Sequence, residues 1–185
     1  RIDNPDSSLI GLDARPKLPK KMIAMCHFGR SGTGLMHSLM DGHSDVSTLP
    51  STYFSEFFDI LTWQNITFDG WAGMVARFIA MYPVLFDASA PQPVPAIGNS
   101  WITFAGKKEG MANVGESRDG VLTVDKVAFR EELHRLMAHY DQIDASIFFM
   151  LVHMAYEKTL NNSLDKSVIF YHIHNPDICA KINFI

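Results

Sequence analysis

Residues 21–36 are the segment that most constrains the fold, because they read as a buried strand, a small-residue loop and the start of a helix. The run 22–28 is apolar except for His27, as in a strand that is covered on both faces. Glycines 29, 32 and 34 then let the backbone turn sharply and let a ligand approach the amides. The segment predicts a strand–loop–helix unit with a binding loop.

The polar residues of this loop favour an anion as the ligand. Ser31 and Thr33 supply hydroxyl donors and can cap the helix that begins near Gly34. The Arg30 guanidinium, the loop amides and the positive end of the helix dipole add to the same pocket. Phosphate or sulfate is therefore the predicted ligand.

Two common nucleotide-binding loops do not fit this spacing. A Walker A loop needs a lysine after its last glycine, and no lysine follows Gly34. A dinucleotide fingerprint needs Gly-x-Gly-x-x-Gly, whereas these glycines stand at 29, 32 and 34. A glycine-rich turn can also be a simple connection, but its combination with Arg30, Ser31 and Thr33 favours anion binding.

The loop and the residues after it resemble the sulfotransferase family over roughly residues 22–58. The positions that carry this resemblance are Arg30-Ser31-Gly32-Thr33, Leu35, Leu39, Asp41, His43, Asp45-Val46 and Pro50. The resemblance implies that the 5′-phosphosulfate of 3′-phosphoadenosine 5′-phosphosulfate (PAPS) is held by Gly29, Arg30, Ser31, Gly32, Thr33, Gly34 and Leu35. Many family members have a second threonine where this chain has Gly34, so this loop has one hydroxyl donor fewer.

Three residues are candidates for the chemistry of sulfuryl transfer. Arg30 would neutralise charge on the leaving phosphate. Glu56 lies in an aromatic segment and would act as the base on the acceptor, although a surface glutamate is the alternative. His174, in a His-Asn-Pro sequence where the family has Lys-Thr-Pro, is a second base candidate or a histidine satisfied at a strand end. His172 and His174 also suggest a metal pair, but without a third ligand nearby no metal is expected.

The hydrophobic pattern predicts an α/β fold in which a parallel sheet is flanked by helices. Strands are expected at 22–28 and 168–173, with a short strand or loop at 46–50. Helices are expected at 33–42, 70–82, 126–140 and 143–160. The inner face of the first helix is expected to carry Leu35, Met36, Leu39 and Met40.

These elements predict one domain at 21–185 after an extended lead-in at 1–20, with a long irregular region at 91–120. The resemblance implies the nucleotide-kinase-like fold of the sulfotransferases, incomplete at its C-terminal end. In that family the 3′-phosphate site uses an arginine after a further strand and then a serine. No arginine follows Arg135, so that site is expected beyond residue 185 and the chain is expected to show weak or no activity.

Net charge, cysteine count and the length of apolar stretches limit the partners and the location that we expect for this protein. The net charge of −4 gives no reason to expect nucleic-acid binding through a basic surface. Two cysteines in 185 residues predict a reducing, cytoplasmic location rather than a disulfide framework. No membrane span is expected, because the longest apolar stretch, 74–86, is too short and is interrupted. The sequence indicates no oligomeric state.

The sequence therefore predicts a sulfotransferase that moves a sulfuryl group from PAPS to a hydroxyl or amine on a small molecule, glycan or lipid. Two alternatives remain open at this point. One is a catalytically silent anion-binding module on the same fold, which Gly34 and the missing 3′-phosphate site favour. The other is a small-molecule kinase, which the absent P-loop lysine disfavours.

Overall fold

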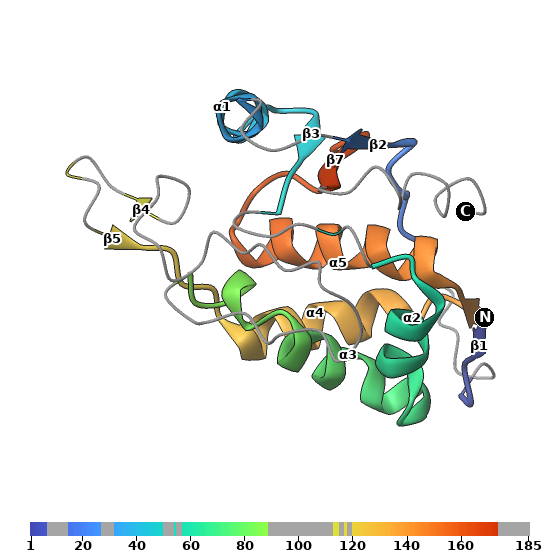
Figure 1. The fold of residues 1–185 in the computed structure, drawn as a ribbon. Coiled ribbons are helices and arrows are strands. Elements are labelled where there is room, and N and C mark those ends of the chain that lie inside the picture. The colour runs from blue at the N-terminus through green and yellow to red at the C-terminus, as the bar shows by residue number, and fades with distance from the viewer. Residues whose placement is uncertain are drawn as a thin grey trace.

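The computed structural model describes residues 1–6, 15–26, 32–49, 54, 57–88, 113–114, 117 and 120–173. In this part of the chain the fold is α/β, with a small parallel sheet between helical layers (Figure 1). The predicted class is confirmed at this level.

The sheet contains β2 (Lys21–Cys26), β7 (Val168–Ile173) and β3 (Val46–Ser47) in the order β2-β7-β3. Both pairings are parallel, and β2 runs beside β7 in register from Lys21 opposite Val168 to Cys26 opposite Ile173. Parallel pairing follows from the long connections, since only a crossover returns the chain in the same direction. The carboxyl ends of the strands therefore lie at one edge of the sheet.

Helices cover the two faces of this sheet (Figure 1). On one face lies α1 (Thr33–Met40), which connects β2 to β3. On the other face lies α5 (Ala145–Thr159), followed by α4 (Lys126–Met137), α3 (Gly70–Met81) and α2 (Ile60–Thr67). The four expected helices are present with ends within three residues of those predicted, and α2 was not predicted.

Short elements complete the described chain. The start of the expected lead-in forms β1 (Ile2–Asp3), which pairs antiparallel with β6 (Gln142–Ile143). A 3-10 turn, η2 (Pro83–Leu85), follows α3, and Pro83 ends that helix as expected. A two-stranded ribbon of β4 (Asn113–Val114) and β5 (Gly120–Val121) extends away from the helices (Figure 1).

An aromatic core holds α5 against both the sheet and the other helices. Phe149 of α5 lies between Phe57 and Tyr171 of β7, with ring centroids 4.6 Å and 5.1 Å away respectively. Farther along α5, the Tyr156 hydroxyl donates a 2.7 Å hydrogen bond to the carbonyl of Leu85. The core therefore lies on the α5 side of the sheet rather than on the α1 side.

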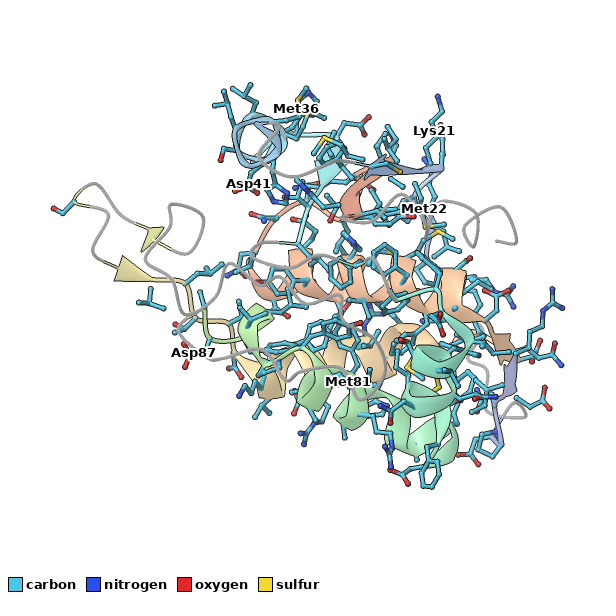
Figure 2. The ribbon with its side chains drawn as sticks, in the orientation of Figure 1. Lys21, Met22, Met36, Asp41, Met81 and Asp87 are labelled. Carbon is cyan, nitrogen blue, oxygen red and sulfur yellow. The ribbon has the colours of Figure 1, made fainter. Side chains whose placement is uncertain are left out.

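The α1 side differs from the sequence-based expectation in two ways. The strand at 22–28 was expected to be covered on both faces, but in the described chain β2 is an edge strand and Ile23 is 44% exposed. The predicted inner face of α1 is also wrong, because Leu35 and Leu39 are 69% and 68% exposed. Met36 points away from the sheet (Figure 2), whereas the His37 side chain is buried. The physical reason is that His37 meets a polar partner on the sheet, which fixes the rotation of the helix.

Within the described ranges, no helix has the length and apolar character that a membrane crossing requires.

Candidate anion-binding site

Three chain segments that carry candidate residues leave the sheet at its carboxyl edge. The last residues of β2 and β7, Cys26 and Ile173, lie opposite each other. The backbone N–H of Phe54 donates a 3.1 Å hydrogen bond to the carbonyl of His172, which brings the aromatic segment to the same edge. Ligands of parallel α/β sheets bind at this edge.

Most of the candidate side chains themselves fall outside the described residues. These are Gly29, Arg30, Ser31, Glu56 and His174. Their neighbours Gly32, Phe54 and Ile173 are described. Of the positions that flank these residues, Cys26, Ile173 and Phe54 lie at one edge of the sheet, and the roles of the five residues remain predictions.

The amino end of α1 is described and has the features of an anion site. Gly32 occupies the N-cap position in the left-handed region, with φ of 77°, and gives the helix no side-chain cap. The first helical hydrogen bonds run from the amides of Leu35 and Met36 to the Gly32 carbonyl, at 3.1 and 3.2 Å. The amides of Thr33 and Gly34 precede these bonds, so helix geometry leaves them pointing out of the helix end.

The charges around this end are also suitable for an anion. The first turn of α1 contains no acidic residue. The helix dipole places partial positive charge there, and a left-handed glycine gives the approaching ligand an open backbone. The Leu35 side chain is exposed and its amide donates to the Gly32 carbonyl, and its role in holding a phosphosulfate stays a prediction.

One turn farther along, α1 contacts the sheet through a pair of buried histidines. His37 Nδ1 and His172 Nε2 of β7 are 2.7 Å apart and share one hydrogen bond, with the ring centroids 4.7 Å apart. Both rings are buried. Burial lowers the pKa of His37, and the carboxylate of Asp41, the C-cap residue of α1, opposes this shift. Neither histidine was assigned this contact from the sequence.

A second polar contact lies on the opposite face of the sheet. Ser47 of β3 and Nδ1 of His153 on α5 are 2.9 Å apart. Burial, with smaller contributions from Lys166 and His37, lowers the pKa of His153 to about 3, so this ring is neutral near pH 7. Both side chains are buried, so the contact joins β3 to α5 inside the protein.

The described residues contain no group of three or more histidine, cysteine, aspartate or glutamate side chains that would hold a metal ion. Of the pair considered for a metal, His172 bonds to His37 and His174 lies outside the described residues.

Comparison of the chain with models of protein families, with curated proteins and with solved structures gave no match. The class that the fold defines is therefore α/β with a small parallel sheet, and the assignment of a function rests on the residues described above.

Proposed function

We propose that this chain is a sulfotransferase, which moves a sulfuryl group from PAPS to a hydroxyl or amine acceptor. The observation that supports this most is the uncapped amino end of α1, which follows a parallel strand directly through the Arg-Ser-Gly-Thr loop. On this proposal the sheet is part of a nucleotide-kinase-like fold, and the location is cytoplasmic.

The described residues fit a sulfated nucleotide in charge and backbone geometry. PAPS supplies a sulfuryl group whose bond to the 5′-phosphate breaks as the acceptor oxygen or nitrogen bonds to sulfur. The amides of Thr33 and Gly34 would hold the 5′-phosphosulfate at the end of α1. Arg30 would take up the charge that develops on the leaving phosphate, and Glu56 or His174 would accept the proton of the acceptor.

Calorimetric titration with adenosine 3′,5′-bisphosphate and with ATP-magnesium tests the proposal. We expect the bisphosphate to bind and ATP-magnesium to bind much more weakly, because the chain has no P-loop lysine. Arg30→Ala should weaken bisphosphate binding by about tenfold or more, as expected for loss of a charge-assisted contact of roughly 1.5–3 kcal/mol. Arg130→Ala, at an exposed position on α4, is the matched control and should leave affinity unchanged.

The outcomes separate the three candidate functions. Preference for ATP-magnesium would reject the sulfotransferase in favour of a kinase. Absence of binding to either nucleotide would reject the anion site itself. Gly34 supports a second candidate, a catalytically silent binding module, because the position has no hydroxyl to orient the transferred group. Bisphosphate binding without sulfuryl transfer from PAPS to hydroxyl or amine acceptors would favour that module.

A further inference from the structure

We propose that the hydrogen bond between His37 and His172 is a proton-sensitive latch, which docks α1 on the sheet and so regulates anion binding at the amino end of that helix. This inference rests on the proposed function, because the regulated site is the same one. It adds a pair of positioning residues that do not touch the ligand themselves.

The geometry makes this pair a specific link between the helix and the sheet. His37 lies one turn after the amino end of α1, and His172 lies one residue before the carboxyl end of β7. The remaining large side chains of α1, including Leu35 and Leu39, are mostly exposed and give little apolar attachment. The 2.7 Å hydrogen bond between His37 and His172 is therefore a main attachment of this part of α1 to the sheet.

His172 connects the same link to the rest of the carboxyl edge. Its carbonyl accepts the hydrogen bond from Phe54 N–H, while its ring bonds to His37. A shift of β7, or of the His172 ring, would therefore change the position of both α1 and the segment that leads to Glu56. The pair is well placed to control the relative position of the two sides of the candidate site.

The groups around the pair determine how it responds to protons. The His37 ring contacts His172 on β7, and two further groups influence it electrostatically: Asp41 at the C-cap of α1 and His153 on α5. The Thr48 hydroxyl donates a 2.8 Å hydrogen bond to Asp41, which satisfies part of that carboxylate. Burial is the larger influence and favours the neutral ring, with Asp41 only partly compensating.

The sign of the pH effect follows from this balance. The docked helix holds His37 with a lowered pKa, whereas an undocked helix exposes a ring with an ordinary pKa of about 6.5. Docking is therefore complete above about pH 6.5 and weakens as the pH falls through that value, because the undocked state binds the proton better. A lower pH should therefore weaken the docking of α1 on the sheet and reduce the affinity of its amino end for an anion.

The test compares the wild-type chain with the double variant His37→Asn/His172→Gln. Asparagine has an amide group where His37 has Nδ1, and glutamine has one where His172 has Nε2, so the hydrogen bond is kept but neither group titrates. Affinity for adenosine 3′,5′-bisphosphate is measured at about pH 7.5 and pH 5. We expect the wild type to lose about tenfold in affinity at the lower pH, because the docked helix disfavours the protonated ring, and the double variant to lose clearly less.

His134→Gln is the matched control, since burial also lowers the pKa of this α4 histidine. It should keep the wild-type pH profile. Comparison between variants also removes the effect of phosphate protonation, because that effect is common to all of them. Equal profiles for the wild type and the double variant, or tighter wild-type binding in acid, would overturn the latch.

A ligand-free measurement separates the latch from the proposed function. Hydrogen-exchange protection of the α1 amides, relative to those of α5, should fall further from about pH 7.5 to pH 5 in the wild type than in the double variant, since His153 on α5 is common to both chains. Acid-sensitive protection in a chain that binds no nucleotide would support the latch and reject the function. Protection that is insensitive to pH in both chains would reject the latch, even where the nucleotide binds. Single variants His37→Asn and His172→Gln serve if the double variant does not fold.

Discussion

Lys166 Nζ and Glu157 Oε2 form a buried ion pair 3.0 Å apart, with the two side chains only 10% and 6% exposed. Asn162 donates a 2.8 Å hydrogen bond to the same carboxylate oxygen. The pair joins the end of α5 to the segment that leads into β7. It therefore helps to fix where the strand that carries His172 enters the sheet.

Removal of the lysine charge should destabilise the protein strongly. In Lys166→Met the Glu157 carboxylate stays buried with its hydrogen bond to Asn162 but without its cation, so we expect the free energy of unfolding to fall by about 3 kcal/mol. Arg135→Met is the control, since the 2.6 Å pair of Arg135 with Glu132 has a largely exposed arginine. This change should cost no more than about 1 kcal/mol in urea denaturation. Equal losses of unfolding free energy in Lys166→Met and Arg135→Met would contradict this expectation, because burial of the Lys166–Glu157 pair would then have no energetic effect.

Stability should fall in mild acid because of His153. Its pKa is about 3 in the folded chain and about 6.5 when unfolded, so the unfolded state takes up a proton first as the pH falls. The free energy of unfolding should therefore decrease by about 1.4 kcal/mol for each pH unit between roughly pH 6 and 4.

The variant His153→Asn should show a shallower slope in the same denaturation series. It keeps a polar atom near the position of Nδ1 for Ser47 but does not titrate. Some slope should remain, since burial lowers the pKa of His37 as well. An unchanged slope would show that His153 is not the group responsible.

The aromatic core should be sensitive to loss of Phe149. This side chain is fully buried between the sheet and the helices, so Phe149→Ala should lower the free energy of unfolding by roughly 3–5 kcal/mol. Phe68→Ala provides the contrast, because Phe68 is 77% exposed, with the Arg77 guanidinium over its ring. Its loss should cost about 1 kcal/mol or less in thermal unfolding.

The sequence predicted the α/β class, the four expected helices and the β-rich run at 168–173 because their hydrophobic periods are regular. Strand order was not predicted, since β7 inserts between β2 and β3 from far along the chain. The helix α2 was missed because the segment has no clear apolar stripe, and Ile66 is its one fully buried residue.

For the candidate site, the pattern located the loop and the start of α1 but gave α1 the wrong inner face. A run of Leu and Met was taken as the buried stripe, whereas a hydrogen bond between His37 and His172 turns the helix. Hydrophobic period alone does not reveal a polar contact with a strand 135 residues away. The available signal was the spacing of Phe170 and His172, which are two residues apart on β7 and so lie on the same face of the strand, the face that meets α1.

The most direct measurement of the anion-binding claim is the affinity of Gly32→Ala and Gly42→Ala for adenosine 3′,5′-bisphosphate. The two glycines flank α1 with φ of 77° and 72°, and a Cβ on either would meet no atom within 4 Å. Each substitution therefore costs a similar backbone strain of about 1–2 kcal/mol, but only Gly32 lies at the amino end. We predict about tenfold weaker binding for Gly32→Ala and wild-type affinity for Gly42→Ala. Equal affinities for the two variants would contradict anion binding at the start of α1.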